Sequence, residues 1–198
     1  MRFAKIAVLV SALTLGAAAA HAAPITYGFG GGLAFPTGDA GDALKMGWNA
    51  NVYGDYWLSP KTAIGVDIDG NFFSGKDDAV DALKSPAYPD PSISFNTTGF
   101  NAHGIYAFPM EKSKMEPWVR AGLGFYTSKF KIKDAGPLLD SDDSNTDFGY
   151  HLGGGLDWAV SKGMKAGLDA KFTSVMTQDK STNFYSIGLH LTFAGNGE

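Results

Sequence analysis

The chain has 198 residues, enough for one domain and short for two, and it contains no cysteine. This composition excludes disulfide bridges, thiolate metal sites and a lipidated cysteine. The formal net charge is −4, and it becomes −6 once the positive charges of Arg2 and Lys5 are removed with a leader. An acidic chain without a basic cluster is not expected to bind nucleic acid. The 26 Gly, 14 Phe, 8 Tyr and 4 Trp, beside 18% charged residues, are typical of strand-rich barrels.

The N-terminal segment has the three parts of a secretory signal peptide. Residues 1–5 are short and basic, residues 6–20 are apolar, and Ala20-His21-Ala22 forms an A-x-A cleavage site. We therefore expect a signal peptide over 1–22 and a mature domain over 23–198. The alternative is an N-terminal membrane anchor, but the apolar stretch is shorter than the ~20 residues of a spanning helix. No later segment is that long, so a mature protein that enters a membrane must do so as a closed barrel.

Eight segments of the mature chain alternate apolar and polar residues with the period of a β-strand. The last segment is the clearest, because Tyr185, Ile187, Leu189, Leu191 and Phe193 share one face and polar residues share the other. A helix would repeat near 3.6 residues, which none of these segments does. The expected strands are 25–35, 45–58, 62–73, 94–108, 116–130, 146–160, 163–174 and 182–193.

The connections between these segments alternate between short and long. Segments 59–61, 109–115 and 161–163 are short, whereas 36–44, 74–93, 131–145 and 175–181 are longer and polar. Short periplasmic turns and long extracellular loops are the arrangement of outer-membrane barrels, and an even strand number places both termini on the periplasmic side. Within the second long loop, residues 77–84 are expected to form a turn or two of helix.

The alternation is compatible with two kinds of barrel. One is a soluble lipocalin-like barrel with its apolar face inside, and the other is a membrane barrel with that face outside. The polar face favours the membrane barrel, because it is rich in Gly, Asn, Thr, Ser and Asp rather than the Lys and Glu of a solvated surface. Small residues suit the crowded interior of an eight-stranded barrel. The apolar face carries aromatic residues near the strand ends, as interfacial girdles do. Those expected there are Tyr56, Tyr106, Phe108, Trp158 and Phe193 by the short turns, and Phe35, Phe72, Phe95 and Phe148 by the long loops.

With its leader, its eight dyad-repeat strands and its last strand Tyr185–Phe193, the chain resembles the outer-membrane β-barrel domain family of small porin-like, opacity-type and outer membrane protein A- or X-like barrels. The resemblance implies an all-β, eight-stranded, antiparallel, up-and-down transmembrane β-barrel in the cell outer membrane. It also implies a monomer that contacts outer-membrane lipid and lipopolysaccharide and is inserted by the barrel-assembly machinery. In the family that machinery reads a C-terminal aromatic residue, which corresponds to Phe193, although this chain continues to Glu198. Because no further domain follows, anchoring to peptidoglycan is not expected.

Charged residues on the polar face define a candidate site inside the barrel. Buried charges need partners, so we expect a structural network, whereas a solute path or a proton relay is the functional alternative. The lumen glycines favour the alternative, because they could leave a narrow passage. The expected network comprises Asp55, Asp67, Asp69, Arg120, Asp157, Lys165, Asp169 and Lys171, and His103, His151 and His190 lie on the same face.

Neither a metal, a cofactor nor an enzyme is predicted. Residues 140–147 resemble the start of a calcium loop, but Asn145 stands where Gly is required and His151 where the bidentate Glu belongs. A solvated acidic loop tip explains this segment better. No G-x-S-x-G motif is present, and His103 and His151 have no nucleophile beside them.

Three functions remain open after this reading of the sequence. The first is a structural or surface-interaction role carried by the extracellular loops, above all 74–93 and 131–145. The second is a narrow porin-like channel for small solutes, and the third is a lipid-modifying outer-membrane enzyme. A packed interior favours the first function, whereas a continuous water path favours the second.

Overall fold

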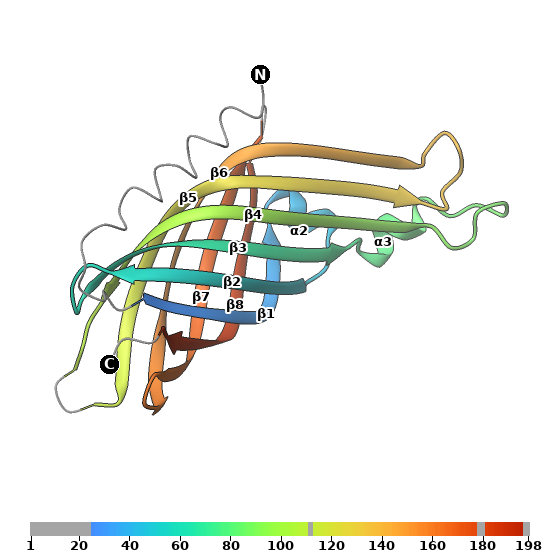
Figure 1. Cartoon of the computed structure of the whole chain (residues 1–198). Helices are drawn as coiled ribbons and strands as arrows, with labels where there is room; N and C mark the ends of the chain where they lie inside the picture. Colours follow the sequence, from blue (N-terminus) through green and yellow to red (C-terminus); the bar gives the residue numbers. More distant parts are fainter. Residues whose placement is uncertain (1–24, 111–112, 178–180, 196–198) are drawn as a thin grey trace, which may run out of the picture.

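A computed structural model describes residues 25–110, 113–177 and 181–195, so the expected signal peptide lies outside the described residues. Eight antiparallel strands follow one another around a closed barrel, and the first strand pairs with the last (Figure 1). The predicted fold is therefore confirmed. The strands are β1 (Ile25–Thr37), β2 (Gly47–Trp57), β3 (Thr62–Ser74), β4 (Ser92–Ala107), β5 (Met115–Lys133), β6 (Ser141–Ser161), β7 (Met164–Met176) and β8 (Ser181–Ala194).

The strand register places the apolar residues of neighbouring strands side by side on the outer surface. Leu168 of β7 lies opposite Leu189 of β8, and Ile187 of β8 lies opposite Leu33 of β1 where the barrel closes. A slip of one residue would turn every one of these side chains inward, so the two-residue period fixes the register. Leu189 is 65% exposed and Leu168 44%, as expected for side chains that face lipid.

Phe193 also lies on this outer surface, where its ring stacks near Tyr27 at 5.8 Å and Phe29 at 6.1 Å. The expectation for Phe95 was wrong. Phe95 pairs with the buried Phe73 in the β3–β4 register, so its side chain points into the barrel. The residues on either side of Phe95 are polar, although they lie on the outer face. Beyond the lipid layer the outer face need not be apolar, so the apolar Phe95 was assigned to the wrong face.

The two predicted sets of connections lie at opposite ends of the barrel, but their lengths separate less clearly than predicted. Seven residues connect β4 to β5 at the short-turn end, whereas only four connect β7 to β8 at the other end. One boundary was wrong, because most of the expected loop 131–145 is strand. β5 continues to Lys133 and β6 begins at Ser141, which leaves only residues 134–140 as a loop. The pairing persists because Ile132 and Phe130 lie on the inner face opposite residues of β4, and because Lys131 forms an ion pair with Asp142 at 2.8 Å. Polar residues alternate along this hairpin without an apolar outer face, so the sequence resembled a loop.

Two short helices lie in the long connections. α3 (Asp77–Asp81) falls where a turn or two of helix was expected, whereas α2 (Asp39–Ala43) was not anticipated. In Figure 1, the β5–β6 hairpin and the segment around α3 project together from the long-loop end of the barrel. Among the described residues, no helix has the length and apolar character needed to cross a membrane.

An apolar cluster fills the lumen near the long-loop end. Phe73 packs edge-on against Phe184 at 5.7 Å and stacks with Phe95 at 6.2 Å. Leu44, from the segment after α2, folds into the same cluster. We call this cluster the apolar plug, and its buried members are Ala34, Leu44, Phe73, Tyr126, Val175 and Phe184. Below it the lumen is polar.

Candidate functional site in the barrel lumen

The centre of the lumen is a chain of amide and carboxylate side chains. Asn101 donates hydrogen bonds to both Asp67 and Asp69 at 2.8 Å, and Asn71 donates to Asp69 at 2.9 Å. Asn49 in turn donates to Asn71 at 2.8 Å. All five side chains are buried. Buried carboxylates require such donors, because an ionised group without partners is strongly destabilising in a low-dielectric interior.

His103 joins two of the aspartates. Its Nε2 lies 2.7 Å from Asp55 Oδ1 and its Nδ1 lies 3.0 Å from Asp67 Oδ1. Ionised carboxylates only accept hydrogen bonds, so both ring nitrogens donate when the two aspartates are ionised. The imidazole then acts as a cation between two anions.

A second Asp–His–Asp bridge lies nearer the short-turn end. His190 Nε2 lies 2.8 Å from Asp157 Oδ1, and His190 Nδ1 lies 3.2 Å from Asp169 Oδ1. The indole of Trp118 donates to the same oxygen of Asp157 at 2.8 Å. Asp157 lies opposite Gly167, with Lys165 and Asp169 on either side of that glycine, as the sequence predicts.

The cations of the lumen are distributed around these bridges. Lys171 lies 3.5 Å from Asp69, and Lys165 forms an ion pair of 2.8 Å with Glu116, which the predicted network did not include. Arg120 lies over two aromatic rings, with its Cζ 5.0 Å from the centroid of Trp118 and 5.4 Å from that of Tyr53. Such cation–π contacts stabilise a guanidinium without a carboxylate.

All eight residues of the predicted network therefore project into the lumen, but they do not form one cluster. Asp55, Asp67, Asp69 and Lys171 meet in the middle, and Asp157 and Asp169 meet nearer the short turns. Lys165 and Arg120 lie at the edge of a cavity. The histidines are the connections that the predicted network left out.

Glycine positions explain how the histidines reach their partners. Asp55, Gly65 and His103 lie in one row across β2, β3 and β4, so the two side chains meet above the glycine. A Cβ atom at Gly65 would lie 2.6 Å from His103 Nε2. Gly167 plays the same part between Asp157 and His190. Neighbouring side chains therefore lie over these two lumen glycines, as the expected structural network requires, and a passage remains the alternative.

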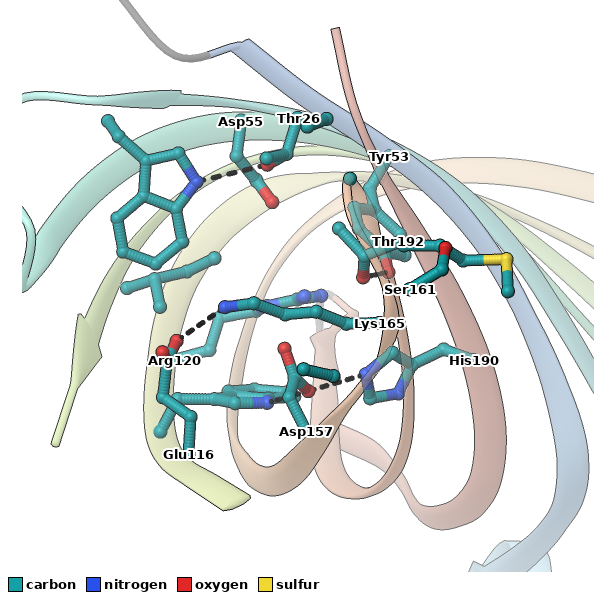
Figure 2. Close-up of a pocket in the computed structure, with 17 residues that line it drawn as sticks. Thr26, Tyr53, Asp55, Glu116, Arg120, Asp157, Ser161, Lys165, His190 and Thr192 are labelled. Carbon is teal, nitrogen blue, oxygen red and sulfur yellow. Dashed lines mark hydrogen bonds and ion pairs between the residues drawn. The ribbon is translucent and has the colours of Figure 1, made fainter. Parts of the chain in front are cut away.

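A cavity of about 290 Å³ opens at the short-turn end of the lumen (Figure 2). Figure 2 shows the Asp157–His190 bridge, the Glu116–Lys165 pair and the Tyr53–Thr192 contact around it. Both charges and apolar surface line this space. The residues that line it include Thr26, Tyr53, Asp55, Trp57, Glu116, Trp118, Arg120, Asp157, Lys165, His190 and Thr192.

Comparisons with known proteins agree with this architecture. Neisserial surface protein A is similar at a TM-score of 0.64 and 14% identity, over 86% of this chain and 97% of that one. A major outer membrane protein from Thermus thermophilus is similar at a TM-score of 0.58 and 13% identity, over 88% of this chain and 100% of that one. Ail, the attachment invasion locus protein of Yersinia pestis, is similar at a TM-score of 0.51 and 12% identity, over 86% of this chain and 99% of that one.

These likenesses establish the fold, and no curated protein sequence matches the chain. The family described as outer membrane protein beta-barrel domain matches residues 6–193. The location in the cell outer membrane follows from this match and from the structural neighbours. The chain belongs to the outer membrane protein beta-barrel domain family.

Proposed function

We propose that this protein is a closed barrel that presents a rigid β-extension outside the membrane for surface interactions. The observation that carries the proposal is the order of layers in the lumen. The apolar plug lies at the long-loop end, and the buried Asp–His network lies below it. A side-chain-filled interior is usual for eight strands, so the function falls to the parts that project from the membrane.

The β-extension consists of the long-loop ends of β4, β5 and β6, at residues 92–98, 127–133 and 141–147. It is paired throughout, from Ser92 opposite Lys133 to Ser141 opposite Ile132, and is therefore a shaped surface and not a loose loop. A paired ladder loses less conformational entropy on binding than a flexible loop does.

The outer face of the β-extension carries a row of lysines. Lys129, Lys131 and Lys133 alternate with inward residues, so they share the outward face that lower down carries the exposed Phe125. Lys129 lies four positions after Phe125, about 13 Å along the strand at 3.3 Å per residue. The lysines thus follow directly above the apolar band, at the level of anionic headgroups. We propose the phosphates of lipopolysaccharide as the partner of this face.

The experiment compares the refolded chain in phosphatidylcholine vesicles with and without lipopolysaccharide. We expect lipopolysaccharide to slow unfolding in urea, and we expect the triple variant K129Q/K131Q/K133Q to lose this effect. The matched control is K129R/K131R/K133R, which keeps the charge and should keep the effect. High salt should weaken the effect, because exposed charges are screened. An unchanged response in the glutamine variant would refute the assignment of this partner.

A narrow channel is the second candidate, and the polar cavity at the short-turn end favours it. Asp157, Lys165 and Arg120 would supply selectivity in such a path. This candidate requires the apolar plug to open, and it predicts discrete conductance where the closed barrel predicts none.

We assign no catalytic activity to the lumen. Both ring nitrogens of His103 and of His190 face carboxylates, so these two imidazoles are not free to accept a proton from a nucleophile. The third lumen histidine, His151, is fully buried, so a lipid substrate would not reach it. An assay of phospholipid and lipid A turnover tests this assignment, and we expect no turnover above that of protein-free vesicles.

A further inference from the structure

We propose that Asp67, His103 and His151 form a binding site for a divalent transition-metal ion of the zinc type in the middle of the lumen. These residues come from β3, β4 and β6, and one ligand atom from each lies within 4.8 Å of the others. His103 Nδ1 lies 3.0 Å and His151 Nε2 lies 4.0 Å from Asp67 Oδ1. All three side chains are buried.

An unpartnered nitrogen points to a ligand at this place. His151 is fully buried, yet within the described part of the chain its Nε2 has no hydrogen-bond partner. Its Nδ1 lies 3.4 Å from the hydroxyl of Tyr126. In the tautomer whose Nδ1–H donates to that oxygen, Nε2 carries the lone pair on the side of Asp67. A buried acceptor without a donor is disfavoured, whereas a metal ion would satisfy it.

The surroundings supply the outer contacts that metal ligands usually have. His103 Nε2 lies 2.7 Å from Asp55, so a metal that replaces the Nδ1 proton leaves a carboxylate–histidine–metal arrangement. The second oxygen of Asp67 accepts a hydrogen bond from Asn101 at 2.8 Å, which orients that carboxylate. Asp55 and Asp67 together offset the charge of a divalent ion, while the nearby Lys171 is matched by Asp69 at 3.5 Å.

The donor set selects the class of ion. Two imidazoles and one carboxylate suit zinc, nickel or copper, whereas calcium and magnesium prefer oxygen ligands in larger number. Ligands around a tetrahedral zinc ion lie about 3.3 Å apart at bonds of about 2.0 Å. The 3.0 and 4.0 Å separations from Asp67 bracket this spacing, and all three ligand atoms lie within 4.8 Å of one another, so binding would require them to draw closer by about an ångström. Three protein ligands leave one position for water.

The short-turn cavity offers an entry path. Asp55 lines this cavity and also contacts His103, one of the proposed ligands, so the cavity approaches the site from the short-turn end. An ion would therefore arrive from the periplasmic side, below the apolar plug.

The test uses the refolded, untagged chain with zinc and cobalt ions as the probes. Competition with a chromophoric chelator should give one tight zinc equivalent per chain. Cobalt at the same site should give visible absorption bands of four-coordinate geometry. His151→Gln and Asp67→Asn should each weaken zinc binding by at least about 100-fold, more than the loss of an outer-shell contact costs. His190→Gln is the matched control, because it removes a lumen histidine outside the site and should leave binding unchanged.

Heat-modifiable gel migration shows whether each variant has folded. If one ligand variant fails to fold, the other ligand variant and the cobalt spectrum of the unmodified chain still test the proposal. A folded wild-type chain that binds no zinc equivalent tightly would overturn the proposal. So would tight binding that survives unchanged in folded His151→Gln.

Discussion

Removing the His103 side chain should strongly destabilise the barrel. Asp55 is 4% exposed and Asp67 is 3% exposed, and each contacts one nitrogen of this ring, at 2.7 and 3.0 Å. Loss of one partner from a buried ion pair costs about 3–5 kcal/mol, because the remaining charge stays buried and unpaired. Asp67 retains its hydrogen bond from Asn101, and Asp55 borders the cavity. We therefore expect His103→Ala to cost about 3 kcal/mol, at the lower end of that range.

Equilibrium unfolding in urea, followed by tryptophan fluorescence in vesicles, measures this free energy. A second variant tests its cause. In His103→Ala/Asp55→Asn one of the two uncompensated carboxylates is replaced by a neutral amide, so the double variant should recover about 1–3 kcal/mol of the loss. Asn51→Ala is a control that removes only a neutral hydrogen bond of 3.4 Å, and it should cost about 1 kcal/mol or less. A cost below about 1 kcal/mol for His103→Ala, or a double variant no more stable than the single one, would refute the reasoning.

Three further predictions test other parts of the molecule. Leu189→Arg, on the outer face, should lower the free energy of unfolding by about 2–4 kcal/mol. Thr192→Arg, at the cavity, should lower it clearly less, and equal losses would contradict the assignment of faces. Gly122→Leu should cost about 1–3 kcal/mol, since the new side chain meets the imidazole of the neighbouring strand; unfolding midpoints check this, and an unchanged midpoint would argue against a filled lumen. The hydrogen bond from Lys131 holds the pKa of Asp142, on the β-extension, below its usual value; an NMR titration should show this pKa rising in Lys131→Ala, and a pKa that stays in place would contradict the ion pair.

The sequence predicts most of the barrel because the strand pattern is local. Alternation along residues 182–193 and 163–174 identifies strands. The polar face contains few Lys and Glu residues, so it is not a solvated surface and the opposite, apolar face must be the one that faces lipid. Both signals depend on the bilayer, which demands an apolar outer face only within its thickness. Outside that thickness the same strands continue with polar outer faces, which is why residues 131–133 and 141–145 resembled a loop and Phe95 was placed on the wrong face.

The lumen network is harder to predict because its contacts join residues far apart in the chain. His103 and Asp55 are 48 positions apart, and their contact depends on Gly65, which lies between them only once the register is known. The sequence shows lumen glycines and lumen histidines separately. A rule that pairs a large side chain with the glycine opposite it would have connected the two sets of residues.

We propose that the lumen is closed to ions, and single-channel recording in planar bilayers tests this closure most directly. The refolded chain is first shown to be a barrel by heat-modifiable migration, and current is then recorded across a range of voltages. We expect a folded barrel that inserts and stays silent, because the apolar plug and the buried Asp–His bridges close the lumen beyond the short-turn cavity. Discrete, reproducible openings whose ion selectivity changes in Asp157→Asn would contradict it and would establish the cavity as the mouth of a channel.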